Sequence, residues 1–306
     1  MDNLYSFIVV KNFNEYLNAF KKGYFPEYII WNNPNSTKEI EDYLFRSNRK
    51  YDDDDYFLYA IHNFINYKHM IKYVYGVLDY LLKKGYKRAM IYMARFYYEC
   101  GSVDGFESHF ITSVTKKEIQ KAEDILLKAI YNENLKIGYY YLYKMYSLTN
   151  VASYKNPSEA LINGANAKEP LCIEEKIMES FINYNEETLK YSKYGIEVNS
   201  SLSMMTYAEI LLDGKLVPPN YDLAYELFEK SFTISRFNKQ QMDINVYVFY
   251  VKLMKKCPKY KPILFDKILN SEHLYLNDLE KIKKNYEEYL DKNKKSSIGD
   301  FGDFEI

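Results

Sequence analysis

Short amphipathic helices with small residues at fixed places constrain this chain more than any other feature. Residues 88–98 are predicted to form one helix, because their apolar side chains recur at the i, i+3, i+7 spacing of a single face. Residues 121–129 are predicted to form a second, in which Ala122 and Ala129 stand seven apart and allow a close helix contact. A hairpin of this kind cannot bury its apolar face alone. The sequence therefore predicts a stack of similar hairpins.

The same pattern recurs along most of the chain. The predicted hairpins pair residues 56–66 with 71–84, 88–98 with 121–129, 137–148 with 158–168, 171–183 with 186–198, and 203–212 with 221–232. Equivalent positions in the first helices of four hairpins are taken as Ala89, Gly138, Ile173 and Ser203, which are 49, 35 and 30 residues apart. The pattern weakens afterwards, where 243–256, 262–270 and 277–292 are predicted as less regular helices.

One stretch resembles a known family. It reads Tyr207-Ala208-Glu209-Ile210-Leu211-Leu212-Asp213-Gly214, then Leu216-Val217, Asp222, Ala224 and Leu227-Phe228-Glu229-Lys230-Ser231. This is similar to a Sel1-like repeat, although Ala replaces the family glycine at positions 94 and 208. The resemblance, which extends over residues 55–235, implies an all-α, right-handed, tetratricopeptide-like α-solenoid. It also implies a scaffold that holds other proteins.

The first fifty residues depart from the repeat pattern. They suggest strand, helix, strand and helix at 5–10, 14–22, 28–31 and 36–45. The interpretation we prefer is a cap over the first hairpin, because repeat arrays need a polar end. The expected organisation is an N-terminal cap at 1–50, a repeat array at 51–235, degenerate helical hairpins at 236–292 and a disordered tail at 293–306.

Composition restricts the kinds of partner and the cellular compartment that we expect. A net charge of −1 gives no field that would select nucleic acid or an anionic membrane. No apolar run approaches the ~18 residues of a membrane span, and three cysteines make a disulfide framework unlikely, so a cytoplasmic protein is expected. The 35 tyrosines have two interpretations: an aromatic binding surface, or drift toward codons rich in A and T, which we favour.

Catalytic motifs are missing from the sequence. It contains no phosphate-binding glycine loop and no metalloprotease or hydrolase signature, so we expect no catalytic residues, no metal and no cofactor. The acidic run 52–55 is interpreted as favouring the positive end of a helix dipole. The alternative is an enzyme, or the regulatory subunit of one, with a site in residues 1–50 or in the 101–115 insertion. The polar residues that cluster in that insertion are Asp104, Glu107, Ser108 and His109.

The expected function is therefore to bind a protein segment on the concave face of the array, which the first helices line. The residues predicted there are Arg88, Ile91, Arg95, Tyr98, Tyr140, Lys144, Glu175, Glu179, Met205 and Glu209. Their charges run from basic to acidic along the face, which would orient a bound peptide or helix. Two alternatives remain: these are ordinary solvated helix faces, or the array binds RNA, which the acidic half disfavours.

Overall fold

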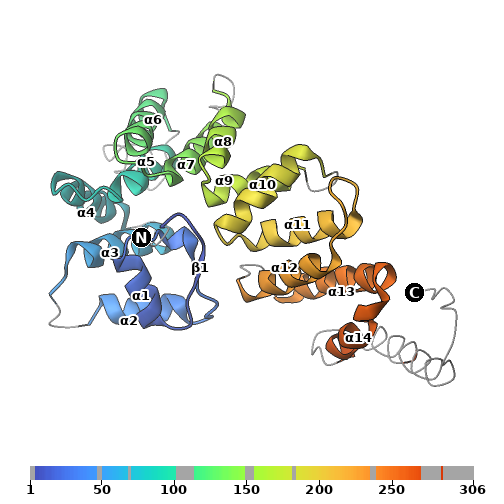
Figure 1. The fold of residues 1–306 in the computed structure, drawn as a ribbon. Helices are drawn as coiled ribbons and strands as arrows, with labels where there is room; N and C mark the ends of the chain where they lie inside the picture. Colours follow the sequence, from blue (N-terminus) through green and yellow to red (C-terminus); the bar gives the residue numbers. More distant parts are fainter. Residues whose placement is uncertain are drawn as a thin grey trace, which may run out of the picture. The chain divides into compact units, whose positions relative to one another are not determined.

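Most of the chain is α-helical in the computed structural model (Figure 1). The structure describes residues 4–46, 50–67, 70–100, 114–148, 155–180, 184–234, 239–269 and Lys284. The predicted 101–115 insertion (apart from its last two residues), the helix at 277–292 (apart from Lys284) and the tail lie outside the described residues. No helix within the described ranges has the length and apolar character needed to cross a bilayer.

Helices predicted from periodicity are observed within a few residues of their expected bounds. They are α3 (Asp53–Asn66), α4 (Ile71–Lys83), α5 (Ala89–Cys100), α6 (Lys116–Tyr131), α7 (Ile137–Tyr146), α8 (Pro157–Asn166), α9 (Pro170–Glu179) and α10 (Glu186–Glu197). Each of these packs against the next along the chain. The first helices of successive pairs also contact one another, α5 with α7 and α7 with α9, and so form a continuous layer.

A residue with left-handed backbone marks each junction between successive helix pairs. These residues are Gly85, Asn134, Lys168 and Asn199, with φ between 53° and 82°. Four positions later comes a buried residue of small or modest size, in turn Ala89, Gly138, Cys172 and Ser203. The prediction that Ile173 holds this position is thus wrong by one residue. Cys172 occupies it because its side chain is the one that faces Gly164 of the preceding helix.

Size complementarity explains these small residues. A Cβ on Gly195 would overlap the Ser203 hydroxyl, and one on Gly164 would overlap the Cys172 thiol. At the previous junction the roles are exchanged, because a Cβ on Gly138 would lie 2.7 Å from Ile130 of the preceding helix. One glycine in each pair therefore lets the two helices approach closely.

The N-terminal segment (residues 4–46) has the strand–helix–strand–helix order that the sequence suggested. It contains β1 (Ile8–Val9), α1 (Phe13–Lys21), the 3₁₀ turn η1 (Pro26–Tyr28), β2 (Ile29–Ile30) and α2 (Ser36–Leu44). The two strands pair in parallel, with Ile8 opposite Ile29. The segment reaches beyond the first hairpin that it was expected to cap, since the Phe7 N–H donates to the Val198 carbonyl at 2.9 Å.

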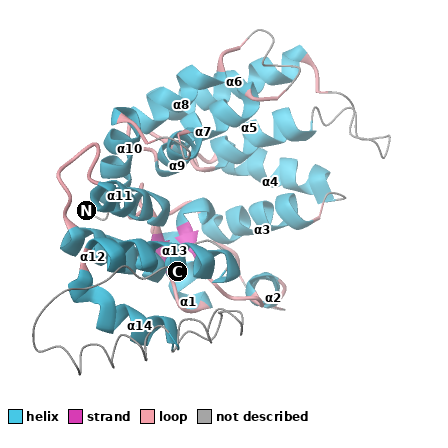
Figure 2. Cartoon of the chain, turned by 90° about the vertical axis from the view of Figure 1, so that its right-hand side faces the viewer, coloured by secondary structure: helices cyan, strands magenta, loops and turns pink. Residues whose placement is uncertain are grey.

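The chain divides into two compact units. One comprises the described residues within 1–207 and 227–236, and the other those within 208–226 and 237–306, so α11 (Ser201–Asp213) and α12 (Tyr221–Thr233) contribute to both. The second unit also holds α13 (Lys239–Lys256), the 3₁₀ turn η4 (Pro258–Tyr260) and α14 (Lys261–Leu269), shown in Figure 2. There the Lys256 ammonium donates to the carbonyls of Leu212 (3.0 Å) and Asp213 (3.2 Å), satisfying acceptors at the end of α11.

Candidate partner-binding site

Five side chains around α5, α7 and the start of α9 bind the N-terminal segment. We call this set the first-helix face: Arg88, Tyr92, Arg95, Tyr141 and Glu169. All lie in or next to the first helix of a pair, and their partners in the segment are residues 20–28. The first helices thus bind a stretch of polypeptide from the same chain.

Arg88 holds the C-terminal end of α1. One guanidinium nitrogen, Nη1, donates to the backbone carbonyls of Phe20 (2.9 Å) and Tyr24 (3.0 Å), while Nη2 donates to Asp54 (2.6 Å). The guanidinium also lies over the rings of Phe20 and Phe57, 4.7 and 5.0 Å from their centroids. A cation at a helix C-terminus satisfies free carbonyls and interacts favourably with the helix dipole.

Glu27 forms the centre of a second set of contacts. Its Oε1 accepts hydrogen bonds from the hydroxyls of Tyr92 (2.7 Å) and Tyr141, and it lies 3.5 Å from Arg95 Nη1. Burial, and then the adjacent Glu27 carboxylate, raise the pKa values of both tyrosines well above their ordinary value. Both hydroxyls therefore stay protonated and act as donors.

Arg95 is held on all sides. Its Nε donates to Glu99 (2.8 Å), and the guanidinium lies about 5 Å from the ring centroids of Phe64, Tyr92 and Tyr141. Burial lowers the pKa of Arg95, but the neighbouring Tyr141, Tyr92 and Glu99 raise it by more, to above its ordinary value. The guanidinium is therefore a permanent cation within an aromatic enclosure.

The buried contact between Tyr28 and Glu169 extends the first-helix face to α9. The Tyr28 hydroxyl donates to Glu169 Oε1 at 2.7 Å, and the backbone N–H of Cys172 donates to Oε2 at 2.6 Å. Glu169 is thereby the N-cap of α9. Because the carboxyl is fully buried, desolvation raises its pKa, although these hydrogen bonds oppose the shift.

The predicted concave-face residues have several different environments. Arg88 and Arg95 bind the N-terminal segment as described, and Ile91 and Tyr98 are buried. Met205 and Glu209 are half-buried, and Glu209 belongs to the second unit while the other nine belong to the first. The ten residues are therefore distributed over both units.

Four of the predicted residues do form a partly accessible group on α7 and α9. Lys144 pairs with Glu175 at 2.8 Å and lies 5.2 Å from the centroid of the Tyr140 ring. Glu179 pairs with Lys176 at 2.7 Å, and its side chain is 47% exposed. This group carries both signs of charge close together.

Sequence reasoning missed Glu27, Tyr28, Tyr92, Tyr141 and Glu169. A usable signal existed for two of them. Glu27 is the one charged residue in the run 24–30, and a charge within a buried apolar run needs partners. Glu169 precedes Pro170, and proline favours the first position of a helix, so Glu169 stands where an N-cap is expected.

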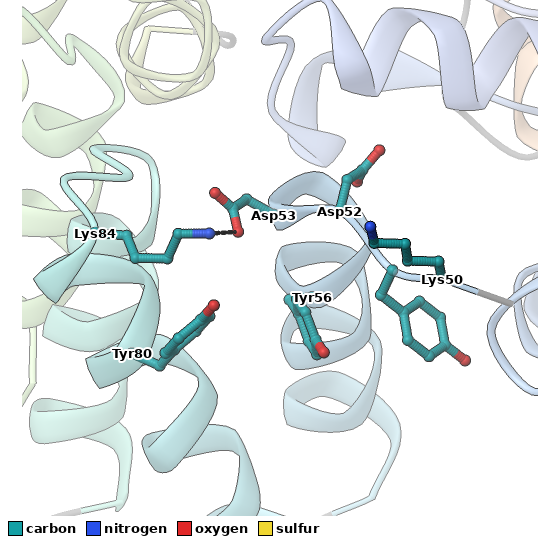
Figure 3. A pocket seen from close by; sticks show the side chains of 7 residues that line it. Lys50, Asp52, Asp53, Tyr56, Tyr80 and Lys84 are labelled. Carbon is teal, nitrogen blue, oxygen red and sulfur yellow. Dashed lines mark hydrogen bonds and ion pairs between the residues drawn. The ribbon is translucent and has the colours of Figure 1, made fainter.

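A second feature, the tyrosine groove, lies between α3 and α4. We define it by Tyr56, Tyr59, Tyr73 and Tyr80. Its polar end has a volume of about 580 Å³ and includes Lys50, Asp52, Asp53 and Lys84 along the wall. Figure 3 shows this end, with the Tyr56 and Tyr80 rings on adjacent helices and Lys84 paired with Asp53.

The other end of the groove is less polar. It has a volume of about 650 Å³, shares Tyr56 and Tyr80 with the first, and is completed by Tyr59, Lys72, Tyr73, Gly76 and Val77. Tyr56, Tyr80 and Tyr73 are 37%, 47% and 67% exposed. Large aromatic side chains gathered at an exposed hollow are typical of binding surfaces.

Comparisons with protein-family models, curated proteins and solved structures find no match. Within the described part of the chain, no three His, Cys, Asp or Glu side chains are grouped as a metal site would require. The two surfaces described above are therefore the ones on which a function can be argued.

Proposed function

We propose that the chain is a non-enzymatic protein–protein interaction scaffold. Its helix pairs, on this proposal, are Sel1-like hairpins in a right-handed α-solenoid, and the partner is a peptide or helix rather than nucleic acid or membrane. We also propose a cytoplasmic location. The observation that supports the proposal most is that the first-helix face already binds a polypeptide, namely the N-terminal segment.

The chemistry of that contact suits polypeptide recognition. Arg88 binds backbone carbonyls, which every peptide offers, whereas Tyr92 and Tyr141 select a carboxylate in Glu27. Backbone contacts supply affinity with little dependence on sequence, and charged contacts fix direction. We propose that a partner segment is held in the same way on the neighbouring part of the layer.

The neighbouring part is formed by Tyr140, Lys144, Glu175 and Glu179. These side chains extend the layer of first helices along α7 and α9 and remain partly exposed. A partner with charges of both signs could exchange with the Lys144–Glu175 pair while an apolar residue packs on the Tyr140 ring. Rim charges of this kind mainly set orientation and association rate.

Site-specific photocrosslinking in source-cell lysate would test the proposal. A photoreactive residue is placed at Glu179 in the first-helix layer and, as a matched control, at Glu197 of α10, which is similarly exposed at 54%. We expect one protein to crosslink from position 179 and not from 197. Equal crosslinking from both positions, or none from either, would contradict a partner site on this layer.

The alternative function is that of an enzyme or a regulatory subunit. Its proposed residues in the insertion, Asp104 to His109, lie outside the described residues. In the N-terminal segment, two acidic groups with several polar neighbours are Glu27 and Glu41. The tyrosine partners of Glu27 retain their protons, and Glu41 accepts from the Tyr67 hydroxyl and lies 3.4 Å from His62 Nε2 of α3. Glu27 thus serves to hold the segment, which supports the scaffold proposal over this alternative.

A further inference from the structure

We propose that the tyrosine groove is a second interaction surface, which binds a proline-rich segment in the polyproline II conformation with acidic residues beside the prolines. This inference goes beyond the scaffold proposal, because it uses none of the first-helix face. It rests on a glycine without an internal role, on the arrangement of the tyrosine rings, and on donors and charges left unused by the fold.

Gly76 stands in the middle of α4 without a packing reason. A Cβ built there would meet no atom within 4 Å, and the backbone is helical, so neither crowding nor a left-handed turn requires glycine. Glycine in a helix interior destabilises the helix relative to alanine, so Gly76 lowers the stability of α4 without a packing gain. Gly76 lies in the wall of the groove, where the missing side chain leaves room for a ligand backbone.

The tyrosine rings pack against one another and form a continuous aromatic surface. The centroids of Tyr56 and Tyr80 are 5.9 Å apart with their planes at 70°, and Tyr51 lies 5.6 Å from Tyr56 at 50°. Figure 3 shows the Tyr56 and Tyr80 rings on neighbouring helices. An aromatic surface of this kind offers exposed ring faces and edges on which prolines can pack, as in the aromatic-lined grooves that bind proline-rich segments.

Unused hydrogen-bond donors favour an extended ligand over a helical one. Among the described residues, the hydroxyls of Tyr56, Tyr59 and Tyr73 make no hydrogen bond. A polyproline II segment has no internal hydrogen bonds, so its carbonyls need donors from outside. A helical ligand satisfies its own carbonyls and would instead need a deep aliphatic groove, whereas Val77 is the one aliphatic side chain in the apolar end.

The positive charge at the groove favours a ligand with acidic residues beside its prolines. Asp52 and Asp53 are already neutralised, by Lys21 at 2.6 Å and by Lys84. Lys50 and Lys72, at the two ends of the groove, form no ion pair with any described residue. The groove therefore presents a net positive charge to a ligand, and glutamate or aspartate beside the prolines would complete it.

The test uses the full chain and a fluorescein-labelled peptide of ten prolines followed by two glutamates, with binding followed by fluorescence anisotropy. Two control peptides have the prolines replaced by alternating glycine and serine, or the glutamates replaced by lysines. We expect saturable binding of the first peptide with a Kd below roughly 1 mM, and at least tenfold weaker binding of either control. No saturation, or equal binding of the glycine–serine peptide, would overturn the proposal.

Variants locate the binding. We expect Tyr73→Ala and Gly76→Leu to weaken peptide binding at least tenfold, with a melting temperature that Gly76→Leu leaves unchanged or raises. Tyr131→Ala is the matched control, because Tyr131 of α6 is 69% exposed and lies outside the groove. Unchanged affinity in Gly76→Leu, or an equal loss in Tyr131→Ala, would contradict the proposal. If an amphipathic helical peptide bound more tightly at the same residues, the groove would be a site for a helix, and the polyproline II proposal would be wrong.

Discussion

The Tyr28 hydroxyl and the Glu169 carboxylate, 141 positions apart, form a buried hydrogen bond of 2.7 Å. The same carboxylate accepts a backbone N–H of the first turn of α9, from Cys172. One side chain therefore both begins a helix of the array and attaches the N-terminal segment to it. Loss of either contact would leave a fully buried polar group without its partner, which is costly.

The burial of Glu169 predicts a pH-dependent stability. Desolvation raises its pKa in the folded chain, so folding binds the proton more tightly than the unfolded chain does. Stability from this group is then present in full below the ordinary pKa of 4.5 and decreases as pH rises from there toward the raised value. We expect Glu169→Gln, which keeps an acceptor for Cys172 and an amide for the Tyr28 oxygen, to reduce this decrease.

Urea unfolding of both proteins at a series of pH values from 4 upward would measure the effect. Glu186→Gln is the control, since Glu186 is an exposed residue in the first turn of α10. Equal pH profiles for the Glu169→Gln variant and the unchanged protein would show that the carboxyl titrates as it does in the unfolded chain.

Arg88 is expected to be essential for attachment of the N-terminal segment. Its side chain is 11% exposed and binds two carbonyls and one carboxylate. Arg88→Ala should cost about 3 kcal/mol of unfolding free energy, because Asp54 loses its ion-pair partner and keeps the Tyr86 hydroxyl, while both carbonyls lose a charged donor. Arg88→Lys should recover little, since one ammonium cannot reproduce the planar fork.

The neighbouring Lys87 provides the control for Arg88. Its side chain is 62% exposed and pairs with Glu133, so Lys87→Ala should change the unfolding free energy by less than about 1 kcal/mol. Denaturant titrations of the three variants give the comparison. A loss in Arg88→Ala no larger than that in Lys87→Ala would exclude the proposed attachment.

The contact between Gly195 and Ser203 predicts a compensating pair of substitutions. Gly195→Ala places a methyl group against the Ser203 side chain, and overpacking of this kind costs about 1–3 kcal/mol. Adding Ser203→Gly should recover part of that loss, because it gives the arrangement that Gly138 and Ile130 have two junctions earlier. A double-mutant cycle on thermal unfolding would measure the coupling. Additive effects would mean that the two helices can separate to admit the methyl group.

Gly76→Ala is expected to raise the stability of the chain, whereas Gly195→Ala is expected to lower it. Because the added Cβ meets no atom within 4 Å, the substitution should stabilise the chain by roughly 0.5–1 kcal/mol through helix propensity alone. Thermal unfolding measures this independently of any ligand. Destabilisation would show that Gly76 has a structural role, and would remove one support for the tyrosine groove as a binding site.

Local features of the fold could be predicted from the sequence. Helices such as α4 and α10 follow from apolar periodicity, which depends on neighbours three and four positions away. The equivalence of Ile173 was wrong by one residue, because buried residues at 171, 172 and 173 leave the phase of α9 open. Only the contact between Cys172 and Gly164 determines it.

The position of the N-terminal segment could not be predicted in this way. The bonds that fix it join residues such as Arg88 and Phe20, or Tyr92 and Glu27, which no periodic pattern relates. Periodicity identified Ile91 as facing away from the partner helix, yet it is fully buried in the folded chain. A helix face that looks solvated in one hairpin can be covered by a distant segment.

The tyrosine groove was visible in the sequence but was not interpreted. In α4 the buried residues Ile71, Val74 and Leu78 form one stripe, and Tyr73, Gly76 and Tyr80 form another at the same helical spacing. Codon drift, the interpretation favoured for the 35 tyrosines, does not account for the position of that second stripe. Tyrosines elsewhere, such as Tyr92 and Tyr141, serve instead as buried donors.

The hydrogen bond between Tyr28 and Glu169 also has a consequence for synthesis. At ribosomal rates of 5–20 residues per second, a nascent chain that has made Tyr28 waits roughly 7 to 28 s before Glu169 exists. Throughout that interval Tyr28 and the Phe7 N–H lack their partners on α9 and at Val198, although the earlier residues Phe57 and Arg88 already exist to cover Phe20. The N-terminal segment is thus translated before the helices but acquires its full set of contacts only after them. Until its partner helices are made, the newborn chain is exposed to aggregation or to chaperones.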